Sequence, residues 1–169
     1  FARKYVDGAH LIIASTPRTP SQCLDARAKL HNKLNHIIAE LEAKSVDPSA
    51  YVLMLDTQGY LAECTAQNIF LVRNGQLLTP THDSILEGVT RDAIQELALK
   101  QDIPYLETDL SLYDLSIADE VFVSANSITI MPISKVNGKA RRNPAPGPVT
   151  QRLLAAWKDM VGGDIVKQA

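Results

Sequence analysis

The chain has few of the features that mark several common classes of protein. Its 2 cysteines, Cys23 and Cys64, form no Cys-x-x-Cys pair, so neither a disulfide framework nor a zinc site is indicated, and a reducing cytoplasm is the expected location. No apolar run approaches the roughly 20 residues of a membrane-spanning helix. A formal net charge of −2 gives no electrostatic reason to expect nucleic acid or an anionic membrane as a partner. The histidines lack metal-ligand spacing, so we expect no metal site.

The hydrophobic pattern instead predicts one folded domain in which strands and helices alternate. A chain of 169 residues can bury roughly two-thirds of its unfolded surface. Short apolar runs are typical of strands, and Gln58-Gly59 and Asn74-Gly75 are typical of tight turns between them. We therefore expect an α/β (α+β) fold with a barrel-like mixed sheet and flanking helices. The predicted strands are residues 10–15, 51–56, 60–63, 69–73, 76–79, 105–107, 118–125 and 128–136.

Four segments have the pattern of helices. Asp25 is the predicted N-cap of the first, which continues to Lys44. Its apolar residues recur at three- and four-residue steps and are expected to pack on the core: Leu30, Leu34, Ile37, Ile38 and Leu41. The second, at 89–100, is expected to turn Val89, Ile94, Leu97 and Ala98 inward. The others are residues 110–114 and 149–160, and residues 1–8 are expected to be polar and irregular.

The stretch from residue 63 to residue 91 combines a carboxylate with a helix start. Glu63 ends a short apolar strand, and a helix begins after Gly88, at the same end of the predicted sheet. A helix N-terminus presents free N–H groups and a partial positive charge, which suit a phosphate. This pairing fits a phosphorylated heteroaromatic cofactor.

This stretch resembles the signature of class-IV, fold-type-IV pyridoxal-phosphate enzymes, which include branched-chain and D-amino-acid aminotransferases and aminodeoxychorismate lyase. The matching elements are Glu63, Asn68-Ile69-Phe70, Leu77-x-Thr79 and Leu86-x-Gly88-Val89-x-Arg91. The resemblance extends from about Gly8 to about Lys158. Its further landmarks are Arg18-x-Pro20, Asp25, Lys29, the ADEVF run, Met131-Pro132 and Gly147-Pro148-Val149-Thr150.

The resemblance implies a domain organisation and a set of partners. Residues 9–169 would be the large domain that binds pyridoxal 5'-phosphate, and residues 1–8 a linker from an N-terminal domain that this chain lacks. A homodimer is expected, with an amino acid and a 2-oxo acid as small-molecule substrates.

Lys29 is the expected Schiff-base lysine, because Asn32 and Leu34 follow it in the family's K-x-x-N-x-L form. Lys33 is its nearest rival. The resemblance makes Glu63 the partner of the pyridine nitrogen, where a carboxylate keeps the ring protonated. The alternative is an acid that faces solvent at a strand end.

The remaining cofactor contacts follow from the same motif. Val89 and Thr90 are expected to bind the phosphate through backbone N–H groups, with Leu86 against a face of the ring. Arg91 is expected to be a surface or salt-bridge residue. Asn126 stands where many aminotransferases have a phosphate-binding threonine, and Ser127 and Thr129 are alternatives to it.

The expected activity is transamination of a branched-chain or other apolar amino acid, with 2-oxoglutarate as acceptor. Lys29 would act as general base and acid. Two alternatives stay open at this point. One is β-elimination on aminodeoxychorismate with the same lysine, and the other is a cofactor-binding remnant without turnover.

Overall fold

The computed structural model describes residues 2–81, 83 and 85–163. Phe1 and residues 164–169, at the two ends of the expected linker and domain, lie outside the described residues. The strands are β1 (Ala9–Ile13), β2 (Tyr51–Leu55), β3 (Leu61–Cys64), β4 (Asn68–Arg73), β5 (Gln76–Thr79), β6 (Tyr105–Glu107), β7 (Glu120–Ala125), β8 (Thr129–Val136) and β9 (Lys139–Ala140). The helices are α1 (Arg3–Asp7), α2 (Leu34–Lys44), α3 (Val89–Lys100), α4 (Leu112–Ile117) and α5 (Pro148–Val161).

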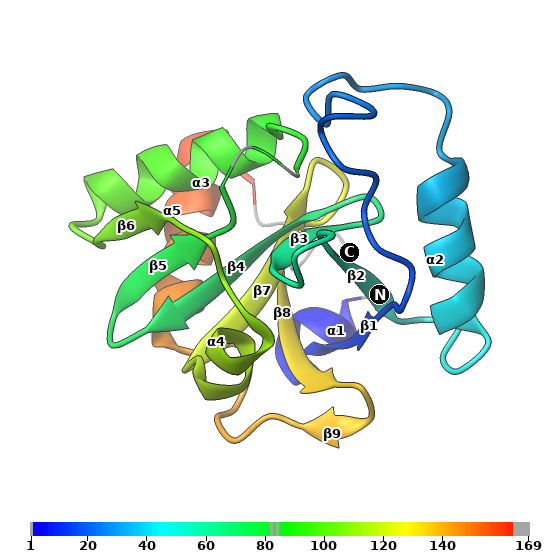
Figure 1. The fold of residues 1–169 in the computed structure, drawn as a ribbon. Coiled ribbons are helices and arrows are strands. Elements are labelled where there is room, and N and C mark those ends of the chain that lie inside the picture. Colours follow the sequence, from blue (N-terminus) through cyan, green and yellow to red (C-terminus); the bar gives the residue numbers. More distant parts are fainter. Residues whose placement is uncertain (1, 82, 84, 164–169) are drawn as a thin grey trace.

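Within the described part of the chain, nine strands form one mixed sheet in the order β3-β2-β1-β8-β7-β4-β5-β6, with β9 paired to β8. The pairs β1–β2, β1–β8 and β5–β6 are parallel, and the other pairs are antiparallel. The sheet curls into a half-barrel with α2, α3 and α5 outside it (Figure 1). The expected fold class, a barrel-like mixed sheet with flanking helices, is confirmed.

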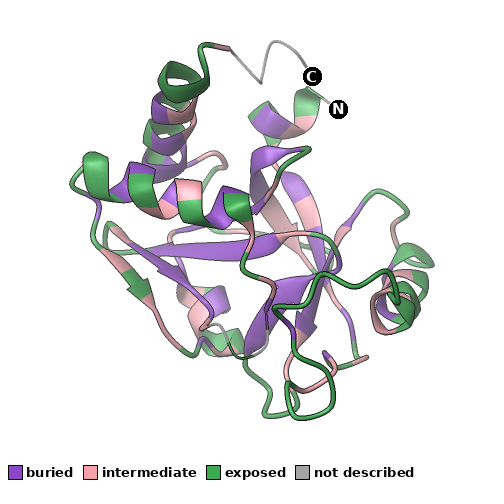
Figure 2. Ribbon diagram, turned by 90° about the horizontal axis from the view of Figure 1, so that it is seen from above, coloured by how far each residue is buried: buried purple, intermediate pink, exposed green. Residues whose placement is uncertain are grey.

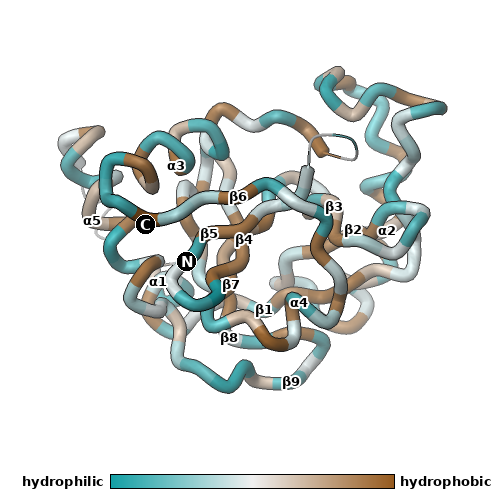
Figure 3. Tube along the Cα trace, turned by 60° about the vertical axis from the view of Figure 1, so that its left-hand side comes forward, coloured by the Kyte–Doolittle hydropathy of each residue, from teal (hydrophilic) through white to brown (hydrophobic). Residues whose placement is uncertain are grey.

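Most strands are buried on both faces, which explains why they are continuous apolar runs in the sequence. On β4, Ile69 and Leu71 face the core inside the curled sheet, and Phe70 and Val72 face the layer under α3 and α5. This alternation follows from the two-residue period of a strand. Figure 3 shows apolar residues in brown along the central strands and hydrophilic residues in teal around β9.

Two sets of helices cover the outside of the sheet on opposite sides (Figure 1). Helices α3 and α5 pack over β4, β5, β7 and β8, where the rings of Phe70 and Phe122 stack with centroids 4.9 Å apart. Helix α2 lies over β1 and β2, and it contributes Ala39 and Ala43 to a smaller apolar cluster. In Figure 2, α3 and α5 carry several buried purple segments, whereas α2 is mostly green and pink, that is, exposed or intermediate.

The predicted strands are confirmed to within two residues at either end, and the hairpin turn at Asn74-Gly75 has the positive φ angles, 50° and 77°, that its sequence favours. The helices at 89–100 and 149–160 are also confirmed, the latter as α5. The short helix predicted at 110–114 begins two residues later, as α4. Strand β9 was not predicted, because a two-residue strand carries no periodic signal.

The prediction of a helix over residues 25–44 is wrong in its first half, because α2 begins only at Leu34. Asp25 does not cap it. Its carboxylate instead accepts hydrogen bonds from the backbone N–H and the guanidinium of Arg27, an arrangement that competes with helix. The predicted core face is also wrong, since all five of its apolar residues are exposed: Leu30 41%, Leu34 63%, Ile37 50%, Ile38 46% and Leu41 69%.

Two smaller corrections concern α1 and Val89. Residues 3–7 are helical rather than irregular, because Tyr5 is buried and its hydroxyl donates a hydrogen bond to the Ile128 carbonyl at 2.7 Å. Val89 points outward and is 76% exposed, whereas Ile94, Leu97 and Ala98 face inward as predicted. Among the described residues, no helix has the length and apolar character that crossing a bilayer requires.

Candidate active site

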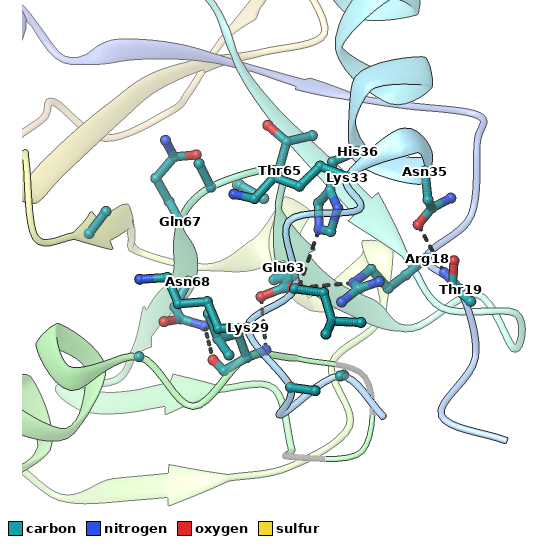
Figure 4. A pocket seen from close by; sticks show the side chains of 18 of the residues that line it. Arg18, Thr19, Lys29, Lys33, Asn35, His36, Glu63, Thr65, Gln67 and Asn68 are labelled. Carbon is teal, nitrogen blue, oxygen red and sulfur yellow. Dashed lines mark hydrogen bonds and ion pairs between the residues drawn. The ribbon is translucent and has the colours of Figure 1, made fainter. Parts of the chain in front are cut away.

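A pocket of about 340 Å³ lies between the loop after β1, the first turn of α2, the end of β3, the start of α3 and the β7–β8 turn. The view in Figure 4 shows Glu63 near its centre. The residues that line it come from distant parts of the chain, and they include all six predicted site residues: Lys29, Glu63, Leu86, Val89, Thr90 and Asn126. The fold therefore brings these residues together, while their chemical roles stay predictions.

Glu63 is held by three neighbours. Its Oε1 accepts a hydrogen bond from Arg18 Nε at 2.9 Å, and its Oε2 accepts one from the Leu86 backbone N–H at 2.9 Å. His36 Nε2 lies 3.6 Å from Oε1 (Figure 4). Glu63 and Arg18 are both buried, so the idea of a solvent-facing acid is wrong. These contacts fix the position of the carboxylate in the pocket.

Cys64, next to Glu63, is a neutral group. Burial, with a smaller effect of the Glu63 charge, raises the pKa of its thiol far above the ordinary value of 9.0. A thiol in this environment is neither a nucleophile nor a metal ligand. Cys64 therefore packs as a small apolar side chain.

The start of α3 is fixed against the sheet. Asn68 Nδ2 donates a hydrogen bond to the Leu86 carbonyl at 2.9 Å, so both polar groups of the Leu86 backbone have partners. A Cβ atom at residue 88 would overlap Asn68 Oδ1, and only glycine allows this close approach. The sequence Leu-x-Gly thus sets where α3 begins relative to Glu63.

Within the part of the chain that the structure describes, the N-terminus of α3 presents free backbone donors to the pocket. Its N-cap, Gly88, makes no side-chain cap, and the Asp92 N–H is the donor of the first intrahelical bond, to the Gly88 carbonyl at 3.1 Å. The N–H groups of Val89 and Thr90 precede that bond, so they are available to an anion. Thr90 also buries its side chain at the pocket wall.

Lys29 lies in the loop between β1 and α2 and lines the pocket together with Lys33 (Figure 4). The ion pair between Asp25 and Arg27 at 2.9 Å shapes this loop on one side. On the other side, Asn35 accepts a hydrogen bond from the Thr19 N–H at 3.0 Å and donates one to the Pro17 carbonyl at 2.8 Å. The lysine is therefore carried by a loop rather than by a helix.

The turn between β7 and β8 forms another wall of the pocket, from Ser124 to Ser127. Asn126 lies in this turn. In the part of the chain that the structure describes, the buried atoms Ser124 Oγ and Gln67 Oε1 have no hydrogen-bond partner, although both residues line the pocket. Because buried polar atoms are costly to leave unpaired, these two point to a polar ligand.

Arg91 is not a pocket residue. It is 1% exposed, and its guanidinium forms an ion pair with Glu107 at 3.0 Å. The salt-bridge prediction is confirmed, and the alternative of a surface residue is wrong. Arg91 ties α3 to β6 behind the pocket.

Sequence reasoning missed several residues of the pocket. Arg18 was recognised as part of a motif, but nothing in its position along the chain indicated that it pairs with Glu63. His36 and Gln67 were missed entirely. The helical spacing of His36 with Ala39 and Ala43 places all three on one face of α2, and that is the signal that could have found it.

Comparison with known proteins agrees with this geometry. The class IV amino-transferase family model matches residues 2–136. A branched-chain-amino-acid aminotransferase of Pseudomonas aeruginosa is 34% identical over 130 residues, covering 77% of this chain and 42% of that protein.

Two solved structures have closely similar folds. The branched-chain aminotransferase of Thermoproteus uzoniensis, solved with norvaline, has a TM-score of 0.85 and 32% identity over 93% of this chain and 52% of that one. The branched-chain aminotransferase of Escherichia coli has a TM-score of 0.86 and 32% identity over 96% of this chain and 53% of that one. The chain thus spans about half the length of these proteins. It belongs to the class IV aminotransferase family.

Proposed function

We propose that this chain binds pyridoxal 5'-phosphate and takes part in transamination of a branched-chain or other apolar amino acid, with 2-oxoglutarate as acceptor. The observation that carries the proposal is the meeting of Lys29, Glu63 and the free N-terminus of α3 in one pocket. An amine, a carboxylate and an anion site are the three contacts that this cofactor needs. The unpaired Ser124 and Gln67 atoms further support a polar ligand.

Each residue has a distinct part in the proposal. The bound cofactor supplies an electron sink for the Cα–H bond that breaks. Lys29 Nζ would hold the cofactor covalently and would carry the proton as general base and acid. Glu63, fixed by Arg18, would accept the pyridine N–H.

The remaining contacts orient the cofactor. The N–H groups of Val89 and Thr90 would bind the phosphate, with the Thr90 hydroxyl as a further donor, and Leu86 would pack on the ring. Asn126 occupies the position of the expected phosphate-binding threonine. Residues 9–169 would form the cofactor-binding domain, and α1 would pack against it through the buried Tyr5.

Labelling of Lys29 tests the proposal directly. Borohydride reduction of the chain with bound cofactor, followed by peptide mapping, should place the label on Lys29. The Lys29→Ala variant should lose the absorbance of the covalent adduct and keep its fold. A label on Lys33 would move the catalytic role to that residue.

Substitution of Glu63 tests the electron sink. Glu63→Gln should retain the cofactor and lose most turnover, because an unprotonated ring is a poor electron acceptor. If Glu63→Gln turned over at the parent rate, the role of Glu63 would be structural, as the partner of Arg18.

The reaction type is separated by product analysis. Amino-donor-dependent loss of the adduct absorbance indicates transamination, pyruvate release indicates β-elimination, and neither indicates a remnant without turnover. Substrate series of L- and D-amino acids would give the donor preference. A homodimer, measurable by sedimentation, and a cytoplasmic location remain predictions.

A further inference from the structure

His36 is a titratable residue beside Glu63 that the proposed function does not use. It lies in the first turn of α2, with its side chain 16% exposed and Nε2 3.6 Å from Glu63 Oε1. Its buried Nδ1 has no hydrogen-bond partner within the described residues. A distance of 3.6 Å is too long for a hydrogen bond, so in this state His36 acts on Glu63 through its charge and its placement.

Glu63 has limited capacity for further partners. Arg18 occupies one site on Oε1, and the Leu86 N–H occupies one on Oε2. A carboxylate offers about four acceptor positions, so room remains for a ring N–H and for an approaching imidazole. The ring N–H and the imidazole would then both interact with the negative charge of Glu63.

The charged groups around His36 come from three elements. Glu63 lies on β3 and Arg18 on the loop after β1, while Glu40 and Lys33 lie on α2 and just before it. Burial opposes the ionisation of Glu40. Hydrogen bonds from Lys44 and Thr65, with the charges of Lys44 and His36, outweigh that burial and lower the pKa of Glu40. His36 therefore lies close to two carboxylates, Glu63 and Glu40, and to the cations Arg18 and Lys33.

We propose that His36 is a positioning residue whose charge sets how much of the negative charge of Glu63 is available to the pyridine nitrogen of the bound cofactor. When His36 is neutral, the carboxylate of Glu63 interacts with the ring N–H alone. When His36 is protonated, it also attracts the negative charge of Glu63, and the contact between Glu63 and the ring is weaker. Imidazole changes its charge between about pH 5 and 8, so the electron sink responds to pH in that range. The inference rests on the proposed role of Glu63.

The first measurement uses the cofactor-free chain and does not depend on the proposed function. NMR titration of the histidine ring signals should show that Glu63→Gln moves the His36 midpoint to lower pH by about 0.5 unit or more, because an anion 3.6 Å away is removed. His31, exposed in the loop before α2, is the internal reference, and its midpoint should stay unchanged. An unchanged His36 midpoint in a folded Glu63→Gln variant would overturn the inference.

The second measurement leaves Glu63 intact, so it stands even if Glu63→Gln does not fold. With cofactor labelled with ¹⁵N in its ring, the nitrogen signal of the parent chain should shift between about pH 5 and 8 in step with the His36 titration. The shift should be lost in His36→Gln and kept in the matched control His31→Gln. A shift that persists in His36→Gln would overturn the role of His36 alone. A parent chain that does not bind the cofactor would overturn the proposed function and this role with it.

Discussion

On one side of the pocket, α3 and α5 bury large aromatic and aliphatic side chains against the sheet, whereas on the other side α2 is attached mainly through polar groups. Phe70, Phe122 and Ile94 have no exposed surface. Under α2, two alanines supply the apolar contact, and the carboxylate of Glu42 accepts hydrogen bonds from Ser15 and Thr16. The proposed phosphate end of the site therefore rests on a packed core, and the proposed catalytic amine rests on a loop held by hydrogen bonds.

The largest effect on the free energy of unfolding should come from a substitution in the layer under α3 and α5. Phe122→Ala removes a fully buried ring that stacks on Phe70, and it should lower the free energy of unfolding by about 3–5 kcal/mol. Urea unfolding monitored by circular dichroism measures the loss. A loss below about 1 kcal/mol would mean that this layer repacks and that the two sides differ less than their burial indicates.

A second test on the same side concerns a buried cap. Glu120 accepts hydrogen bonds from the Val149 and Thr150 N–H groups, both at 2.8 Å, and from the Thr150 hydroxyl at 2.6 Å. Glu120→Gln removes the charge at the N-terminus of α5 and should cost about 1.5–3 kcal/mol in the same assay. Asp159→Asn, at the far end of α5, is the control and should be nearly neutral. Equal losses for the two variants would contradict a capping role.

The same contrast explains what the sequence could predict. The β4–β5 hairpin and α3 were found because their strand period, Asn-Gly turn and helix start all agree, and because the packed core preserves that pattern. The core face of the helix predicted at 25–44 was assigned wrongly because Leu34, Ile37, Ile38 and Leu41 form a regular apolar stripe. That stripe faces outward, and Ala39 and Ala43 form the buried face.

The candidate site divides in the same way. Glu63, Leu86, Val89, Thr90 and Lys29 were selected because their order and spacing match one motif. His36 and Arg18 reach Glu63 from other parts of the chain, and their contacts depend on how α2 and the loop before it dock on the sheet. Polar contacts between distant segments produce no periodic pattern in the sequence, so the sequence did not predict them.

The attachment of α2 should depend on pH. The Ser15 hydroxyl and backbone N–H, followed by the same groups of Thr16, donate to Glu42 and hold the pKa of its carboxyl below the ordinary value of 4.5. A lowered pKa means that the stabilisation is complete above pH 4.5 and is lost as the pH falls through the folded-state value. Glu42→Gln should flatten the fall of the melting temperature in that acid range.

The effect should be smaller than that of Glu120→Gln, because Glu42 is only partly buried and water screens its charge. Glu96→Gln, on α3, is the control, and its melting curve should keep the steeper acid dependence of the parent. Identical acid dependence in Glu42→Gln and the parent would show that these hydrogen bonds do not hold α2.

The smallest effect should come from the outer face of α2. Leu41 is 69% exposed, so Leu41→Ala should change the free energy of unfolding by less than about 0.5 kcal/mol. Leu97→Ala, at a buried position of α3, makes the same chemical change and should cost about 2–5 kcal/mol. The ratio of the two values, from urea unfolding of both variants, measures how differently the two helices are attached. If Leu41→Ala lowered the free energy of unfolding as much as Leu97→Ala, the outward-facing apolar side chains of α2 would be packed in solution. The conclusion that α2 is attached mainly through polar groups would then be wrong.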